Sequence, residues 1–213
     1  FFEPTLDNFR RILAHPEDTP VLRWFLNSTF VATSYAVLAT AVSALAAFPL
    51  ARMEFRGRGF YTALLFSSLI IPPIMLIIPS FVIVDWLRWT DTYAAVIFPG
   101  LGGVFGVLML RQYFLALPAD LEEAAAMDGA NSWQVFRHVV LPLSESPLLT
   151  LLVMSFMASW NEYFWPLLTL YSPGMRTMPL GMATLQGRYT HHYGVMMAGA
   201  LLIAIPSMIL FVV

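Results

Sequence analysis

Long apolar stretches separate the charged residues of this chain. Five windows, at residues 24–51, 59–84, 92–110, 146–175 and 189–213, contain no Asp, Glu, Lys or Arg except Glu162. A membrane-spanning helix needs about 20 mostly apolar residues, and a charge at its centre costs about 2.5–3.5 kcal/mol. The pattern therefore predicts five transmembrane helices, which we place at residues 28–51, 60–84, 93–114, 147–170 and 194–213.

Proline and glycine occur inside two of these predicted spans. The second span contains Pro72, Pro73 and Pro79, and the third contains Gly100, Gly102, Gly103 and Gly106. Membrane helices tolerate both residue types when neighbouring groups satisfy the freed backbone. Gly102 and Gly106 have the small-xxx-small spacing that lets two helices approach closely. Internal packing is the favoured interpretation, and a hinge used in transport is the alternative.

The composition agrees with a membrane protein. Hydrophobic residues make up 59% of the chain and charged residues 11%, against about 45–50% and about 25% in soluble domains. This balance excludes an ordinary soluble enzyme and a disordered chain. The net charge of −2 gives no basic field for nucleic acid. The absence of Cys excludes disulfides and thiolate metal sites.

The distribution of arginine predicts the orientation. The first loop carries three arginines within residues 52–58, whereas the second carries Arg88 between two aspartates. The positive-inside rule places the first loop in the cytoplasm and the second outside. Alternation then places residues 115–146 inside, and residues 1–26 and 171–193 outside.

The predicted cytoplasmic loop 115–146 carries an ordered helical pattern. Pro118 suits the start of a helix, Asp120 and Glu123 have the spacing of a capping box, and Gly129 is a suitable stop. Asn131 and Gln134 repeat this spacing and would start a second helix, which Pro142 would end. We therefore expect two short helices whose small residues another protein's cleft could receive.

The same loop resembles a known family. It reads Glu123-Ala124-Ala125, three residues, Gly129, nine residues, then Val139-Val140-Leu141-Pro142. This resembles the EAA loop of ATP-binding-cassette importer permeases, in which Glu-Ala-Ala, three residues, Gly and nine residues precede Ile-x-Leu-Pro. Only Val139 departs, and it replaces Ile with another β-branched residue.

The resemblance implies that this loop docks in a groove of a cytoplasmic ATPase and couples ATP binding to alternating access. Glu123 would meet a basic residue of the ATPase, Glu122 is a weaker candidate for that pairing, and Gly129 would permit the turn. The residues implied for coupling are Glu122, Glu123, Ala124, Ala125, Gly129, Leu141 and Pro142. The chain has no G-x-x-x-x-G-K-[ST] phosphate loop. We therefore expect ATP and Mg to bind the partner ATPase, and no cofactor, metal or catalytic site on this chain.

Further segments resemble the smaller permease subunit of maltose-type carbohydrate importers. They are Phe25-Leu26-Asn27-Ser28, the loop 52–58, Asp91-Thr92, Leu110–Phe114, Trp160-Asn161-Glu162-Tyr163 and Arg176–Gly181. The implied fold is an all-α, type I importer permease with five of six core transmembrane helices, lacking the first helix and a C-terminal tail. It divides into an extracytoplasmic segment, 1–26, and a membrane domain, 27–213.

The implied assembly lies in a bacterial or archaeal cytoplasmic membrane. Its partners would be a second related permease subunit, two ATPase subunits, an extracytoplasmic solute-binding protein and a sugar substrate.

Four residues near the outer end of the fourth span are candidates for the substrate pathway. Intramembrane ionisable groups usually face the protein interior or a wet cavity, and carboxylate and amide groups can hydrogen-bond sugar hydroxyls. The candidates are Trp160, Asn161, Glu162 and Tyr163. A structural contact with a neighbouring helix is the alternative for Glu162. Membrane-interface placement is the alternative for the aromatic residues.

The outer loop 171–193 would contact the binding protein by the same resemblance, and a solvated loop is the alternative. The candidate residues are Arg176, Gln186, Arg188 and Tyr189. His191-His192 is a weak metal signal because no third ligand is in view. Residues 5–13 have apolar positions at helical spacing and predict an interfacial helix.

Other functions stay open at this point. The same machine could carry a polyol, glycerol phosphate or peptide. A secondary transporter or channel usually needs midplane ionisable groups, and only Glu162 comes near. An intramembrane enzyme would need a nucleophile or metal motif, and neither G-x-S-x-G nor H-E-x-x-H occurs.

Overall fold

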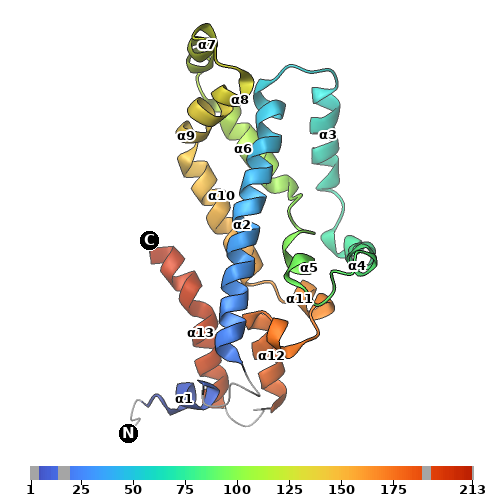
Figure 1. The fold of residues 1–213 in the computed structure, drawn as a ribbon, viewed down its shortest axis with the longest axis vertical. Helices are drawn as coiled ribbons and strands as arrows, with labels where there is room; N and C mark the ends of the chain where they lie inside the picture. The colour runs from blue at the N-terminus through green and yellow to red at the C-terminus, as the bar shows by residue number, and fades with distance from the viewer. Residues whose placement is uncertain (1–4, 14–19, 189–192, 213) are drawn as a thin grey trace. The chain divides into compact units, whose positions relative to one another are not determined.

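The computed structural model describes residues 5–13, 20–188 and 193–212 (Figure 1). Within these ranges every regular element is helical. The chain divides into two compact units. Unit 1 comprises residues 1–35, 77–99 and 156–213, and unit 2 comprises residues 36–76 and 100–155. Helices α2 and α10 contribute residues to both units.

Two continuous helices are long and apolar enough to cross a membrane. They are α2, Val21–Arg52, and residues Tyr193–Leu210 of α13, Tyr193–Val212. At about 1.5 Å per residue, the 32 residues of α2 extend about 48 Å, beyond the about 30 Å of a bilayer's hydrocarbon core. The first and fifth predicted spans are therefore confirmed as helices. Helix α2 begins at Val21, seven residues before the predicted start of the first span at residue 28.

The second predicted span is not one helix. It consists of α3, Arg58–Ser68, the 3₁₀ turn η1, Pro73–Leu76, and α4, Ile77–Trp86. Pro72 and Pro73 supply no backbone N–H, and their rings clash with a preceding helical turn, so α3 cannot continue through them. Pro79 lies in the first turn of α4, where a proline is tolerated.

The third and fourth predicted spans are also broken. Helix α5, Tyr93–Ile97, is separated from α6, Val104–Ala116, by a glycine-rich segment. Helix α10, Glu145–Trp160, is separated from α11, Phe164–Thr169, by three residues. If each sharply bent pair of helices counts as one span, the described residues hold up to five spans. The pairs are α3 with η1–α4, α6 with α7, and α8–α9 with α10.

Unit 2 contains the predicted cytoplasmic loop. The loop folds into α7, Asp120–Met127, α8, Ser132–Val135, the π-helical turn η2, Phe136–Val140, and α9, Leu141–Leu143. These elements lie beside the C-terminal end of α2 (Figure 1). Phe48 of α2 packs on Phe136 with ring centroids 5.0 Å apart. Leu110 and Phe114 of α6 are fully buried in the same core.

Unit 1 packs around the N-terminal part of α2. Helices α1, Asp7–Leu13, and α12, Met178–Arg188, both contact α13. The α1 helix confirms that residues 5–13 contain a helix, and its place at the membrane interface stays a prediction. Helix α12 was not predicted. Trp24 is almost fully buried, and a Cβ on Gly181 of α12 would lie 2.2 Å from its indole ring. Glycine at this position therefore lets α12 lie directly against the Trp24 ring.

The small-xxx-small prediction holds for one of its two glycines. A Cβ on Gly106 would lie 2.6 Å from Oγ of Ser43 on α2 and 3.1 Å from Leu151 on α10, so α6 packs closely here. Gly102 precedes α6, and a Cβ there would meet nothing within 4 Å.

We therefore expect Gly106→Leu to lower stability by about 1–3 kcal/mol, the usual cost of overpacking a filled core. Thermal unfolding of the detergent-solubilised protein measures this cost, with Gly102→Leu as the matched control. Equal unfolding temperatures for the two variants would contradict the close approach of α6.

Candidate functional site

The predicted cytoplasmic loop has one left-handed residue at its turn. Gly129 has φ +87°, a conformation that other residues rarely adopt. Its N–H donates to the Ala126 carbonyl, and the Ala130 N–H donates to the Ala125 carbonyl, both at 3.0 Å. These two hydrogen bonds form a Schellman motif, which ends α7. The prediction that Gly129 stops the first helix is confirmed.

The second helix of the loop begins with a capping box, as predicted. Gln134 N donates to Asn131 Oδ1 at 3.0 Å, and Asn131 N donates to Gln134 Oε1 at 2.8 Å. The capping box predicted for Asp120 and Glu123 is absent, because Ala119 is the N-cap of α7 and makes no side-chain cap. The prediction that Pro142 ends the second helix is also wrong. Helical structure continues through η2 into α9, where Pro142 occupies a first-turn position that needs no N–H donor.

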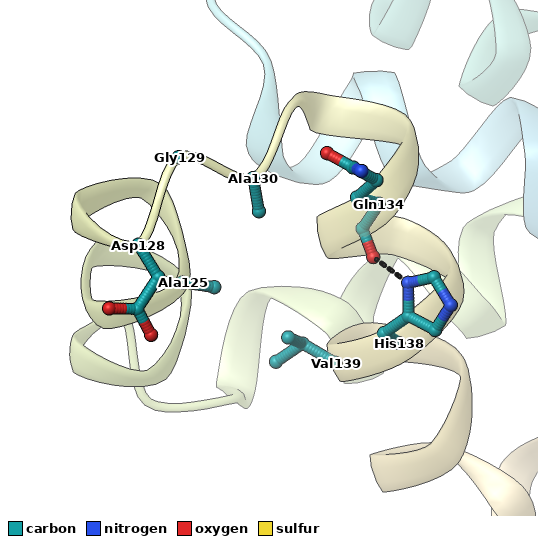
Figure 2. Close-up of a pocket in the computed structure, with 7 residues that line it drawn as sticks. All are labelled: Ala125, Asp128, Gly129, Ala130, Gln134, His138 and Val139. Atoms are coloured by element: carbon teal, nitrogen blue, oxygen red, sulfur yellow. Dashed lines mark hydrogen bonds between the residues drawn. The ribbon is translucent and has the colours of Figure 1, made fainter.

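The α7 surface presents the EAA residues outward. Glu123 and Ala124 are exposed and Ala125 is half-buried. Beside them lies an open hollow of about 250 Å³. Ala125, Ala130 and Val139 point into it, and Asp128, Gly129, Gln134 and His138 complete its lining (Figure 2). The His138 Nδ1 lies 3.1 Å from the Gln134 carbonyl oxygen. The loop thus offers acidic and small side chains around a shallow recess.

Glu122 points away from this surface. Its Oε1 lies 2.9 Å from Nε of Arg52, the last residue of α2, and the two side chains are only 19% and 13% exposed. The Nε–H does not align with the carboxylate as a hydrogen bond requires, so the contact is an ion pair. Burial raises the pKa of Glu122, and the nearby Arg52 charge only partly opposes that rise. The pairing predicted between Glu122 and an ATPase would have to displace Arg52.

The motif Phe25-Leu26-Asn27-Ser28 anchors the backbone of the predicted outer loop. Asn27 Nδ2 donates to the carbonyls of Gly174 and Arg176, both at 2.9 Å, and Asn27 Oδ1 accepts from the Tyr93 hydroxyl at 2.7 Å. Ser28 Oγ accepts from Met178 N at 2.7 Å. These contacts fix the approach to α12.

Asp91 makes a second set of hydrogen bonds to the backbone of unit 1, which we call the Asp91 bracket. Its Oδ1 accepts from Tyr171 N and Ser172 N at 2.9 Å, and its Oδ2 accepts from the Ser172 hydroxyl. Its own N–H donates to the Thr169 carbonyl at 2.7 Å. Partial burial would raise the pKa of Asp91, but the three hydrogen bonds together lower it. Sequence spacing gave no indication of this bracket, since the partners lie about 80 positions apart.

The pathway candidates occupy the break between α10 and α11. Trp160 is fully buried, packs against Phe25 and Phe156, and donates its indole N–H to the Ile203 carbonyl at 3.0 Å. A solute cannot reach its ring in this arrangement.

Asn161, Glu162 and Tyr163, by contrast, are exposed. Glu162 Oε1 accepts from Trp165 N at 3.0 Å, so its carboxylate caps the start of α11. Asn161 Nδ2 donates to the Met157 carbonyl at 2.8 Å.

The predicted binding-protein contacts are placed only in part. Arg176 is half-buried, and its Nη1 donates to the Thr184 hydroxyl at 3.2 Å. Gln186 and Arg188 lie in α12. Tyr189, His191 and His192 lie outside the described residues. Within the described ranges, no three His, Asp or Glu side chains gather as a metal site requires.

Comparison with known proteins decides the family. Residues 29–213 match the family of binding-protein-dependent transport system inner membrane components. The chain belongs to this family. As such a component, it is a membrane transport subunit that works with a solute-binding protein, and the alternative of a secondary transporter or channel is wrong.

Individual relatives support this assignment. The chain is 36% identical to the arabinooligosaccharides transport system permease protein AraQ of Halalkalibacterium halodurans, over 99% of this chain and 76% of the relative. It is 33% identical to the sn-glycerol-3-phosphate transport system permease protein UgpE of Salmonella typhimurium, over 90% and 69%.

A solved structure supports the fold. A bacterial ABC transporter involved in the import of the acidic polysaccharide alginate superposes with a TM-score of 0.80 at 22% identity, over 99% of this chain and 78% of that one. The all-α, type I importer permease fold is thereby confirmed.

The Asp91 bracket generates a pH-dependent prediction. A carboxyl group with a lowered pKa in the folded state stabilises the fold fully above its ordinary pKa of about 3.9 and loses this effect as the pH falls through the lower folded value. We expect the wild-type permease to melt at a higher temperature than Asp91→Asn at pH 6, and the difference to shrink below about pH 3.9. Detergent-solubilised protein at the two pH values provides the measurement. Asp85→Asn, at an exposed position near the C-terminal end of α4, is the control. A difference that does not change with pH would contradict the role of the ionised carboxylate.

Proposed function

We propose that the chain is the permease subunit of an ATP-driven, binding-protein-dependent importer, and that α7 with its turn is the element that docks on a separate ATPase. The exposure of Glu123 and Ala124 on α7, in a chain of this family, carries the proposal. The short helix, held by the Schellman motif at Gly129, offers small side chains that allow close approach and an acidic group that a basic residue can meet.

ATP and Mg would bind the ATPase chains, and this subunit would supply part of the pathway. The complete importer would contain two ATPase subunits, a second related permease subunit, and a binding protein that delivers solute from outside. It would lie in a bacterial or archaeal cytoplasmic membrane, with this subunit crossing the membrane several times.

The cargo we favour is an oligosaccharide or another sugar. The relative with 36% identity is named for arabinooligosaccharides, and the exposed Asn161 and Glu162 carry groups that hydrogen-bond hydroxyls. Glycerol phosphate is the second candidate, because a relative with 33% identity is named for it. The two are separated by asking which solute stimulates ATP hydrolysis by the reconstituted complex in the presence of its binding protein.

The docking proposal predicts the effect of reversing one charge. Glu123→Arg places a cation where we propose a basic partner residue, which we expect to weaken ATPase binding by about 2 kcal/mol or more, a factor of about 30. Copurification of the ATPase with a tagged permease, expressed with its neighbouring genes, measures this effect.

Glu54→Arg makes the same charge change at another exposed position of unit 2 and serves as the control. If Glu123→Arg retained the ATPase as well as Glu54→Arg does, α7 would not be the docking element. If the wild-type chain copurified with no ATPase, the proposed importer itself would be refuted.

Two substitutions of Glu162 separate its capping role from a role in the pathway. Glu162→Gln retains an oxygen that can accept from Trp165 N but removes the charge. Glu162→Ala removes both and should lower stability by about 1 kcal/mol, the usual cost of losing a cap. If the carboxylate serves the solute, both variants assemble and both take up sugar more slowly. Normal uptake by Glu162→Gln, with a lower melting temperature only for Glu162→Ala, would leave capping as its function.

A further inference from the structure

One guanidinium joins three elements of unit 2. Arg52 ends α2, and its Nη2 donates to the carbonyl of Leu117, which follows α6, at 2.5 Å. Its Nε pairs with Glu122 of α7 at 2.9 Å. Both side chains of the pair are largely withdrawn from solvent, so salt and water screen the contact less than they screen a surface pair.

Two other arginines hold the same end of α2. Arg58 of α3 donates from Nε to the Leu50 carbonyl at 2.9 Å and from Nη2 to the Ala51 carbonyl at 2.8 Å. Arg111 of α6 donates from Nε to the Leu50 carbonyl at 3.1 Å. These cations bind carbonyls at the negative end of the helix dipole. The end of α2 is thereby fastened to α3 and α6, and Arg52 is its ionic link to α7.

Glu122 differs in direction from the other acids of α7. Asp120 and Glu123 are exposed, whereas Glu122 faces α2. The helix thus has one face open to a partner and one carboxylate committed to the permease. Among the described residues, the Arg52–Glu122 contact is the one ion pair that α7 makes.

We propose that Arg52 is a positioning residue that transmits displacement of α7 to α2 through its ion pair with Glu122. This inference rests on the proposed function, because it assumes that an ATPase moves α7. The requirement is for arginine rather than lysine. The guanidinium donates from Nη2 to the Leu117 carbonyl while its Nε lies 2.9 Å from the Glu122 carboxylate, so two nitrogens serve two contacts. A lysine ammonium is a single point charge on a flexible stem.

The test uses the complete importer in proteoliposomes, with its binding protein, and measures both sugar uptake and ATP hydrolysis. The variants are Arg52→Lys and Glu122→Gln, and Arg56→Lys, at an exposed position of the same loop, is the matched control. We expect both pair variants to retain the ATPase and to hydrolyse ATP. Their uptake per ATP should fall about five-fold or more, the lower range of coupling effects between sites, while the control matches wild type.

Each outcome is decisive. An unchanged uptake per ATP in both pair variants overturns the proposal. If Arg52→Lys does not assemble, the uptake per ATP of Glu122→Gln alone tests the proposal, because this variant keeps the size of the side chain. Loss of the ATPase from both variants would make the pair a structural support for docking, which also overturns the proposal.

Partial recovery of uptake per ATP in the exchanged pair Arg52→Glu with Glu122→Arg supports transmission through the pair. A wild-type complex without an ATPase refutes the proposed function instead, and it is recognised before any variant is made.

Discussion

Backbone groups that leave a helix inside a bilayer have no water to bind, so the protein must supply their hydrogen-bonding partners. This constraint governs the chain, because three of its five predicted spans are interrupted. The partners are polar side chains at fixed positions. Within the fourth predicted span, Glu162 caps the start of α11. In the predicted outer loop, beyond the predicted spans, Asn27 holds two carbonyls and Asp91 holds two backbone N–H groups in the same way. Charged and polar residues are few in this sequence, and many of those described serve the backbone.

Helix α2 shows the same principle at both of its ends. Near its N-terminus, Trp24, Asn27 and Ser28 bind the backbone of residues 173–178. At its C-terminus, Arg58 and Arg111 bind its last carbonyls, and Arg52 reaches α6 and α7. Of the three arginines that indicate orientation by the positive-inside rule, Arg58 also caps the end of the helix that it follows. This one side chain therefore bears on both the predicted orientation and the termination of α2.

Hydrophobic periodicity predicted where apolar segments lie but not whether each is a single helix. The first and last spans carried no adjacent prolines and no glycine cluster, and both are continuous. The Pro72-Pro73 break could have been predicted from the missing donors. The break after Trp160 has no proline or glycine at residues 160–163, and Glu162 stabilises it by a cap that only the folded backbone reveals.

Local signals in the predicted cytoplasmic loop were partly reliable, since the cap expected from Asp120 and Glu123 is absent and Pro142 does not end a helix. Gly129 and the pair Asn131 and Gln134 act within a few residues of themselves, so their spacing predicted the turn and the second cap. The Arg52–Glu122 pair joins positions 70 apart, and no local rule connects them. Hollows and brackets between distant segments depend on tertiary packing, which a single sequence does not specify.

The amide of Asn27 also bears on the chemical lifetime of the protein. An asparagine followed by a small residue such as Ser28 can slowly lose ammonia and become a carboxylate. At this position the change would convert a double donor into an anion 2.9 Å from two carbonyl oxygens. The backbone N–H of Ser28, which would attack the amide, is held within α2. The folded helix thus protects the residue whose chemical ageing would release the outer loop, and the unfolded chain does not.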